Sequence, residues 1–394
     1  MPELLLIGVG ITGRPYLDVA HRLGLRVHAV EAPSRAAALD GAVEHLTLTR
    51  GETDECWVEA ATAAAAIRRP DGVVAFSEPQ VLAAALLTEE LSLPGPSLRA
   101  TVLSRNKALQ RGCFAAAGIR QPEYLIAPSL AEAADWARDR FPVVLKPLSS
   151  SGSLGVELVV DESGFADAVE RRAGETLLVE QAIDGPEYSW EALVRDGKVW
   201  LSNLTAKETT GPPHFIETGH RMGLPVDDAV TTAANELGGN VLAALGMSTG
   251  IVHLEFRLAD AGPTLMEIAV RTPGDRLMEL LGPVYGIDWF EMVVRLAMGM
   301  LLPDAPTGPL GSAAAHIPLS EPGRITAIDG VDAVRAHPAV IRADVLAEVG
   351  DVIPTAKWSA DRRIVVLASA ADPDTVDDAL SFARRTLRIH TRPS

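Results

Sequence analysis

The first 97 residues alternate short apolar runs with longer helix-forming runs, and this alternation limits the fold more than any other feature of the chain. Apolar runs of strand length are ELLLIGVG (3–10), RVHAVEA (26–32) and GVVAFSE (72–78). Runs of helical length lie between and after them, at 14–24, 56–69 and 80–91. A strand–helix alternation of this kind predicts a parallel, doubly wound sheet and an α/β fold class.

Two changes in composition divide the rest of the chain. The turn-rich segment LPGPS closes the first domain, which we expect to be an α/β domain over residues 1–97. A second break, LLPDAPTGP, separates a larger domain at 98–305 from a small β-rich C-terminal domain at 306–394. The length of 394 residues is sufficient for two or three domains with buried cores.

Within the central domain we expect a helix near 163–172 and a region dominated by strands from 187 to 271. This strand region is predicted to be interrupted by a long loop at 206–225 and by a helix at 227–245.

Charge and cysteine content limit the partners and the setting. The chain has 35 basic and 52 acidic residues, a net charge of −17, which repels nucleic acid and requires a local cluster of cations for any phosphate ligand. It has no run of about 18 uncharged apolar residues and no basic n-region in MPELLLIGVG, so we expect neither a membrane span nor a signal peptide. Two cysteines, Cys56 and Cys113, form no metal motif and fit a reducing cytoplasmic compartment.

The stretch VVLKPLSSSGSLGV (143–156) is an apolar strand that runs into a lysine and then a loop of small residues. An ordinary turn of about two to five residues seldom contains so many small residues. A loop that brings its backbone N–H groups against phosphate oxygens needs small side chains, and a cation such as Lys146 helps. The stretch therefore indicates phosphate binding, with a flexible surface loop as the alternative.

Residues 250–271 alternate apolar and polar side chains on both sides of a turn signal at Ala261–Pro263. Period-two alternation predicts a hairpin that brings Glu255, Glu267 and Arg271 onto one polar surface. The opposite, apolar face would be formed by Val252, Leu254, Phe256, Met266, Ile268 and Val270. Two carboxylates suit Mg²⁺, and an arginine can offset charge on a transferring phosphoryl group. A solvated sheet face with a salt bridge is the alternative.

The segment LLVEQAIDGPEYSWEALV (177–194) is a strand that delivers Glu180 to a break at Ile183–Gly185, after which Glu187 opens another strand. Backbone groups between two lobes can hydrogen-bond a planar base, and a nearby carboxylate can bind ribose hydroxyls. Charged residues around a surface turn are the alternative.

Taken in chain order, these features and Lys107 resemble the ATP-grasp superfamily of carboxylate–amine ligases over roughly residues 1–300. The resemblance implies two lobes that clamp ATP, with residues 123–183 as the mobile lobe. It implies phosphate contacts from Lys107, Lys146 and a loop that contains Ser149, Ser150, Ser151, Gly152 and Ser153 and ends at Gly155. It implies adenine contacts from Glu180, Gln181, Ala182 and Ile183, and a ribose contact from Glu187.

The same resemblance implies that Glu255 and Glu267 bind Mg²⁺, as two ions, with Mn²⁺ as an alternative, and that Arg271 is catalytic. One departure is Ala269, at a position where the family often has Asn. This change removes a metal ligand and leaves the number of ions open.

A second resemblance, in HFIETGHRMGLP (214–225), is to the L-amino acid ligase (dipeptide synthase) branch. It implies that Glu217 holds the α-ammonium of a substrate and that catalytic His220 lies near the developing oxyanion. Residues 306–394 resemble the small C-terminal domain of the same branch, which implies that they wall the site. Asp275, four residues after Arg271, is a separate candidate for shaping the acyl-donor pocket. Lys207 is a further candidate contact, and family members often form homodimers.

The N-terminal GVGITG, with Glu31 at the end of the next strand, fits the dinucleotide-binding fingerprint. ATP-grasp enzymes commonly begin with such a domain, whose glycine turn faces substrate instead. Glu78 ends the third apolar run, at the sheet edge where ligands of open sheets bind, and is a candidate contact for the substrate amine. A charge at a helix N-terminus is the alternative for Glu78.

The sequence thus predicts an ATP-dependent ligase that joins an amino acid carboxylate to the amine of a second amino acid through an acyl phosphate, releasing ADP and phosphate. The alternatives are a ligase for another carboxylate or amine, an NAD(P)-dependent oxidoreductase that uses GVGITG, and a nucleotide-binding regulator without turnover. The identities of the two substrates and the oligomeric state stay open.

Overall fold

The computed structural model describes residues 1–10 and 12–393; Ile11, inside the GVGITG stretch, lies outside the described residues. The N-terminal sheet has four parallel strands in the order β3-β2-β1-β4. They are β1 (Glu3–Ile7), β2 (Arg26–Glu31), β3 (His45–Leu48) and β4 (Gly72–Ala75). The predicted doubly wound α/β fold is therefore confirmed.

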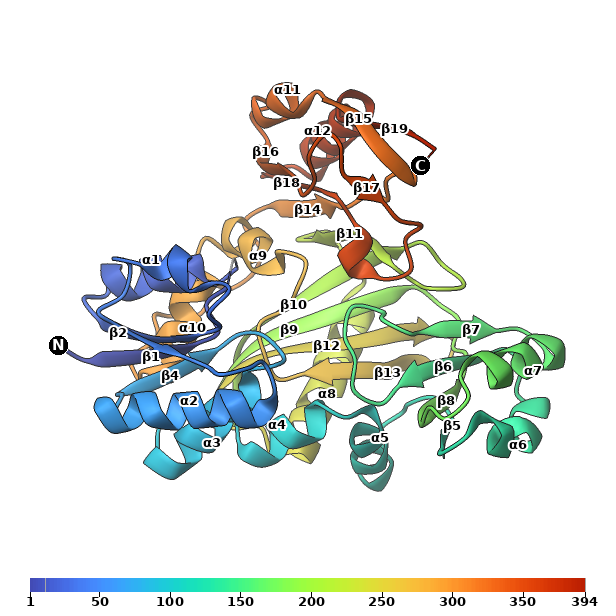
Figure 1. Ribbon diagram of the computed structural model, residues 1–394, viewed down its shortest axis with the longest axis horizontal. Helices are drawn as coiled ribbons and strands as arrows, with labels where there is room; N and C mark the ends of the chain where they lie inside the picture. Colours follow the sequence, from blue (N-terminus) through green and yellow to red (C-terminus); the bar gives the residue numbers. More distant parts are fainter. Residues whose placement is uncertain (11, 394) are drawn as a thin grey trace.

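Helices cover both faces of this sheet (Figure 1). One face packs against α1 (Arg14–Arg22) and α10 (Trp289–Ala297), and the other against α2 (Asp54–Ile67) and α3 (Val81–Leu91). Strands buried on both sides read as continuous apolar runs, which is why β1, β2 and β4 are visible in the sequence. β3 is not, because its side chains alternate between half-buried and exposed positions.

The largest sheet has eight strands in the order β13-β12-β9-β10-β11-β14-β18-β16, all paired antiparallel. Its central-domain strands are β9 (Glu187–Arg195), β10 (Lys198–Thr209), β11 (Glu217–Met222), β12 (Gly250–Ala259) and β13 (Gly262–Ala269). The C-terminal region adds β14 (Ser312–His316), β16 (Val340–Val345) and β18 (Ile364–Ala370). One ladder of backbone hydrogen bonds therefore runs from the central domain into the C-terminal domain.

Helices on the central sheet bury apolar side chains from both of its faces. One face packs on α8 (Asp228–Leu245), α4 (Leu98–Ser104) and α5 (Lys107–Ala116), and the other packs on α9 (Leu277–Tyr285) and α10. The helix expected at 227–245 is α8; Asp227 caps its N-terminus, and Gly246, with φ +69°, ends it in the left-handed region.

A separate lobe projects beside β13 and β12 (Figure 1). Its four antiparallel strands are β5 (Tyr124–Ala127), β8 (Leu177–Gln181), β6 (Val143–Pro147) and β7 (Glu157–Val159), in that order. A core of its own packs this sheet on α6 (Ala134–Arg138) and α7 (Glu162–Arg171), which is the helix expected near 163–172.

The C-terminal region carries a second, smaller sheet in the order β17-β15-β19. It consists of β15 (Gly323–Asp329), β17 (Val352–Ile353) and β19 (Arg388–Arg392). α11 (Val331–Arg335) and α12 (Pro373–Thr386) complete the region. The 3₁₀ turns are η1 (Ala36–Leu39), η2 (Leu130–Ala133) and η3 (Ser359–Asp361).

The prediction of a long loop at 206–225 is wrong. β10 continues to Thr209, and β11 pairs with it from Glu217 to Met222, so only the short connection between them is irregular. This part of the sequence reads as a loop because its polar side chains, among them Lys207 and His220, face a cavity instead of solvent.

Candidate active site

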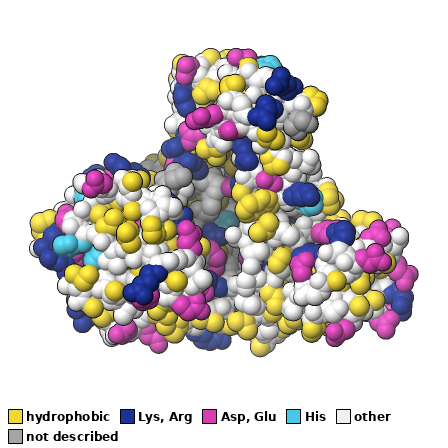
Figure 2. Space-filling view, viewed as in Figure 1, with side chains coloured by type: hydrophobic (Ala, Val, Ile, Leu, Met, Phe, Trp, Pro, Cys, Tyr) yellow, Lys and Arg dark blue, Asp and Glu magenta, His cyan; other side chains and the backbone are white. Residues whose placement is uncertain are grey.

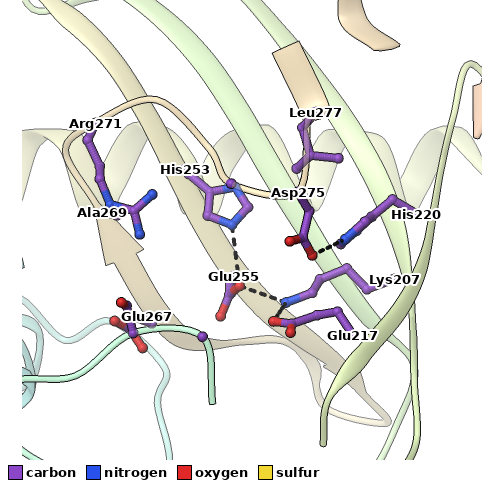
Figure 3. A pocket seen from close by; sticks show the side chains of 13 residues that line it. Lys207, Glu217, His220, His253, Glu255, Glu267, Ala269, Arg271, Asp275 and Leu277 are labelled. Carbon is purple, nitrogen blue, oxygen red and sulfur yellow. Dashed lines mark hydrogen bonds and ion pairs between the residues drawn. The ribbon is translucent and has the colours of Figure 1, made fainter. Parts of the chain in front are cut away.

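Three adjoining cavities lie where the N-terminal sheet, the lobe, the central sheet and the C-terminal region meet, and Figure 2 shows the molecule hollowed there. The hinge cavity, about 310 Å³, is lined from the lobe and the central sheet. The central cavity, about 120 Å³, lies over the central sheet (Figure 3). The interdomain cavity, about 610 Å³, is walled by residues of the N-terminal, central and C-terminal regions.

Shared lining residues show how the cavities follow one another. The hinge and central cavities share Glu217, Glu255 and Glu267. The central and interdomain cavities share Ser151, Arg271, Gly274 and Asp275. The central cavity therefore connects the other two, and most of the predicted site residues lie along this path.

The hairpin of β12 and β13 brings Glu255, Glu267 and Arg271 to the central cavity, as the alternation predicts. Glu255 and Glu267 are direct cross-strand partners. The apolar face differs at one position, because a bulge after this pair sets Phe256 opposite Leu265. Leu265 is buried in the core, and Met266 lines the hinge cavity beside Glu267.

The ammonium group of Lys207 is enclosed by carboxylates. Its Nζ lies 2.6 Å from Glu255, 2.8 Å from Glu187 and 3.6 Å from Glu217. Burial alone would lower the pKa of Lys207, but these three carboxylates raise it well above its ordinary value. Lys207 is therefore a fixed positive charge that holds three acidic side chains together.

Lys107 lies where the lobe meets the hairpin. Asn106 caps α5, so Lys107 is its first residue, and its Nζ donates to the carbonyl of Ser150 at 2.7 Å and to Glu267 at 3.0 Å. It therefore joins a candidate metal carboxylate to the small-residue loop. It also lines the hinge cavity.

Lys146 and Glu180 form a buried cluster with Arg111. Lys146 Nζ lies 2.7 Å from Glu180, and Arg111 donates to the same carboxylate. Burial raises the pKa of Glu180, but Lys146 and Arg111 lower it to about 2. The side chain of Glu180 is therefore held between Lys146 of the lobe and Arg111 of α5, and both Glu180 and Lys146 line the hinge cavity.

The small-residue loop after β6 contacts the C-terminal region. The carbonyl of Gly152 accepts the backbone N–H of Ser359 at 3.0 Å, and Ser153 Oγ donates to the carbonyl of Phe215 at 3.2 Å. Ser151 and Gly152 line the central cavity, and Ser153 lines the hinge cavity. The linings of the three cavities do not include Ser149 and Ser150 among the described residues.

The hinge cavity contains Gln181, Ala182, Ile183 and Glu187. The backbone N–H groups of Gln181 and Ala182 donate to the carbonyls of Glu123 and Pro142. Glu187 pairs with Lys207 and, at 3.0 Å, with Arg257, a residue for which the sequence analysis gave no role.

Glu217, His220 and Asp275 meet two residues of the C-terminal region. His220 Nε2 lies 2.9 Å from Asp275, and Arg362 donates to Asp275 at 2.8 Å. Burial raises the pKa of Asp275, but His220 and Arg362 lower it below its ordinary range. Glu217 accepts a hydrogen bond from Ser359 Oγ. The C-terminal region thus supplies part of the site.

Glu78 and Arg271 are paired at 3.0 Å, and Glu78 also lies 3.4 Å from Arg105. Glu78 lines the interdomain cavity, so the structure brings it to the same site as Arg271. Its carboxylate is shared by two guanidinium groups.

The glycine turn before α1 is filled by the protein itself. Buried Glu31 accepts the backbone N–H groups of Gly10 at 2.7 Å and Ala32 at 2.8 Å, instead of extending toward a ribose. A Cβ atom at Gly8 would lie 2.5 Å from the side chain of Gln80. These contacts disfavour a dinucleotide site. Thr12, which follows the turn, lines the interdomain cavity.

His253 and Glu191 form a polar group under the central cavity that the sequence analysis missed. Glu191 is buried and lies 2.9 Å from His253 Nδ1, while His253 Nε2 lies 3.3 Å from Glu255. Burial lowers the pKa of His253, but Glu191 and Glu255 raise it to about 9. Their alternation along β9 and β12 was the available sequence signal, whereas Arg362 had none because it lies in a distant segment.

The acidic residues of the central cavity fit a magnesium ion that is completed by a ligand. Across residues 1–10 and 12–393, no three His, Cys, Asp or Glu side chains are grouped to hold a metal alone. Mg²⁺ in phosphate sites typically uses one or two carboxylates together with phosphate oxygens and water. Glu255 and Glu267, paired across the hairpin at one cavity, meet this requirement.

Among the described residues, no helix has both the length and the apolar character needed to cross a membrane.

Three consecutive segments of the chain match protein-family models. Residues 17–95 match the ATP-grasp N-terminal domain, residues 139–279 the ATP-grasp domain, and residues 315–392 the L-amino acid ligase C-terminal domain 2.

Curated relatives and solved structures agree with these matches. Carnosine synthase 1 of Gallus gallus is 28% identical over 358 residues, which are 82% of this chain and 38% of that protein. The chain thus spans about two fifths of the length of this relative. The formate-dependent phosphoribosylglycinamide formyltransferase of Chlorobaculum tepidum is 29% identical over 360 residues, 86% of each protein.

Among solved structures, the L-amino acid ligase from Bacillus licheniformis has the same fold, with a TM-score of 0.86 at 24% identity over 100% of this chain and 99% of that one. The three matched segments follow one another along the chain, which therefore carries an ATP-grasp N-terminal domain, an ATP-grasp domain and an L-amino acid ligase C-terminal domain.

Proposed function

We propose that this protein uses ATP to join the carboxylate of one amino acid to the amine of a second amino acid, releasing ADP and phosphate. The observation that carries this proposal is the order of the three cavities around Arg271, Glu255 and Glu267. ATP in the hinge cavity would present its γ-phosphate to the central cavity, where Arg271 and the two carboxylates lie.

In the first step, a carboxylate oxygen of the donor attacks the γ-phosphorus of ATP. The bond to the bridging oxygen breaks, ADP leaves with that electron pair, and an acyl phosphate forms. Lys107 and Lys146 supply positive charge at the hinge cavity, and Ser151 and Gly152 offer a narrow loop beside the transferring group. Bound Mg²⁺, as one or two ions on Glu255 and Glu267, would supply further neutralisation of the phosphate charge.

In the second step, the unprotonated amine of the acceptor attacks the carbonyl carbon of the acyl phosphate. The tetrahedral species carries a negative oxygen, which Arg271 and His220 would stabilise by hydrogen bonding, since both line the central cavity. The C–O bond to phosphate then breaks, phosphate leaves with the electron pair, and the nitrogen releases a proton as the amide forms.

Glu217 is the proposed contact for the ammonium group of the donor. Its carboxylate lies at the junction of the hinge and central cavities and is held by Lys207 and Ser359. Ile183 and the backbone around it are the proposed adenine contact, because the N–H groups of Gln181 and Ala182 already have partners.

A phosphate-release screen over pairs of amino acids, with mass spectrometry of the products, tests the proposal. We expect ADP, phosphate and a dipeptide in equal amounts. A donor labelled with ¹⁸O in its carboxylate should transfer one labelled oxygen to phosphate. AMP and pyrophosphate as products, or phosphate without label, would contradict the acyl-phosphate route.

A ligase for a carboxylate other than an amino acid is the second candidate. It is favoured by the similarity to a formate-dependent formyltransferase along 86% of both proteins. Including formate and acetate in the same screen separates the two candidates, since the amino acid ligase should give no amide with either acid.

A further inference from the structure

The interdomain cavity has an aromatic wall for which the proposed chemistry gives no role. The rings of Tyr16 and Phe76 are stacked, with centroids 5.1 Å apart, and Tyr16 meets Phe290 edge-on at the same separation. All three side chains line the cavity, together with Met278, Ile317, Leu346 and Val365.

This wall is fixed in place beside Arg271. Tyr16 is fully buried, and its hydroxyl lies 2.6 Å from Oγ1 of Thr272, the residue after Arg271. Leu346, by contrast, is 55% exposed, although it lines the same cavity. The apolar surface therefore extends from the neighbourhood of Arg271 outward to solvent.

The charged groups of the cavity lining balance one another. Its acidic residues, Glu78, Asp275 and Glu279, pair with its arginines at 3.0 Å (Glu78–Arg271), 2.8 Å (Asp275–Arg362) and 2.9 Å (Glu279–Arg276). A cavity with neutralised walls disfavours a ligand with a net charge, because no free counter-charge offsets its loss of water. A zwitterion with an apolar side chain has no net charge and can pack its side chain against the apolar wall.

We propose that the interdomain cavity binds the amine substrate, and that this substrate is a zwitterionic α-amino acid with a large apolar or aromatic side chain. This inference rests on the ligase function proposed above. The donor carboxylate has to meet the γ-phosphate, so the donor occupies the small central cavity of about 120 Å³. The interdomain cavity, at about 610 Å³, has the size of a small-molecule site and opens on Arg271 from the side away from the hinge cavity.

The order of residues in the product tests this assignment. The amino acid that reacts through its amine keeps its free carboxylate, so it becomes the C-terminal residue of the dipeptide. With a mixture of phenylalanine, leucine, serine, lysine and glutamate, tandem mass spectrometry should find phenylalanine or leucine at that position. We expect kcat/KM for phenylalanine as acceptor to exceed that for lysine and glutamate by about tenfold or more. The assignment would be overturned if the enzyme preferred charged amino acids as acceptors, or if aromatic residues appeared only at the N-terminal position of the dipeptide.

Phe290→Ala removes one ring of the wall and should raise KM for phenylalanine as acceptor about tenfold, leaving KM for ATP within about twofold. The matched control is Phe382→Ala, which removes a half-buried phenylalanine of α12 that does not line the cavity. Leu346→Asp, at an exposed position that folding tolerates, should weaken the same acceptor by adding an unpaired carboxylate. Equal KM values in wild type and both cavity variants would contradict the proposal.

Calorimetric titration with L-phenylalanine in the presence of ATP analogue and Mg²⁺ separates this inference from the ligase function. Binding that is lost in Leu346→Asp, without phosphate release for any amino acid pair, would refute the ligase and support the ligand class. Phosphate release with no preference among acceptors would refute the ligand class alone.

Discussion

The ammonium group of Lys207 lies 2.6 Å from Oε1 of Glu255, on the side chain that we assign to metal binding. The same ammonium reaches Glu187 and Glu217, so one buried cation joins the proposed ribose, metal and substrate contacts. Lys207 therefore balances a group of carboxylates that would otherwise repel one another in a site of low solvent access.

Lys207→Gln should destabilise the protein strongly, because it leaves three neighbouring carboxylates without their shared cation. Breaking a buried ion pair from one side costs about 3–5 kcal/mol. We expect the thermal midpoint to fall by roughly 5 °C or more. Lys198→Gln, at an exposed position of the same strand, is the control and should change the midpoint little. Similar midpoints for the two variants would contradict the role of Lys207.

Arg271→Ala should lower kcat for phosphate release by about 100-fold or more, because the variant loses the donor that we propose for the developing charge. Circular dichroism should show an intact fold. Arg22→Ala removes an arginine that pairs with Asp288 on the exposed surface, and its activity should match wild type. Wild-type activity in Arg271→Ala would refute the assignment.

Glu267→Ala should also abolish most of the activity while the protein stays folded, since it removes half of the carboxylate pair. Raising the Mg²⁺ concentration should restore part of the activity if the residue binds metal. If the variant is as active as wild type at the same Mg²⁺ concentration, Glu255 and other groups are sufficient to bind the metal without Glu267.

Glu180 should make stability depend on pH in the acid range. Its pKa is about 2 in the folded protein, below the ordinary value of 4.5, so its contribution is complete above about pH 4.5 and is lost as the pH falls toward 2. The shift corresponds to about 3 kcal/mol. Urea unfolding at pH 5, 4 and 3 should show that the free energy of unfolding falls more steeply with decreasing pH for wild type than for Glu180→Gln. Parallel profiles would contradict the lowered pKa.

ATP with Mg²⁺ should raise the thermal midpoint, and NADH should not. A ligand at 100 times its dissociation constant adds about 2.7 kcal/mol to stability. NADH lacks a site in our assignment because Glu31 and Gln80 occupy the glycine turn. Stabilisation by NADH alone would reopen the oxidoreductase alternative.

Much of this architecture is readable from the sequence, because burial leaves a pattern. β1 is apolar throughout since helices cover both faces of its sheet, and the Glu255–Arg271 hairpin alternates since only one of its faces is buried. The same rule fails where a polar face lines a cavity, as in β10 and β11, whose side chains resemble those of a loop.

Contacts between distant segments leave no such pattern. Arg362 lies 87 residues from Asp275 along the chain, and nothing near either residue indicates their pairing. The position of Met266 depends on a single bulge that shifts the register by one residue. Glu180 was expected to contact adenine because it precedes the break, and it lines the hinge cavity; its pairing with Arg111, 69 residues away on α5, leaves no signal in the sequence.

The continuous central sheet has a consequence for dissecting this enzyme. β11 pairs with β14 from Gly219 to Met222, so a protein shortened before residue 312 would leave this edge of β11 unpaired. Unprotected strand edges recruit other chains and promote aggregation. The isolated ATP-grasp portion should therefore be prone to aggregation. If the chain is instead divided in the loop that follows α10 and both fragments are co-expressed, we expect the two fragments to reassemble through this strand pairing.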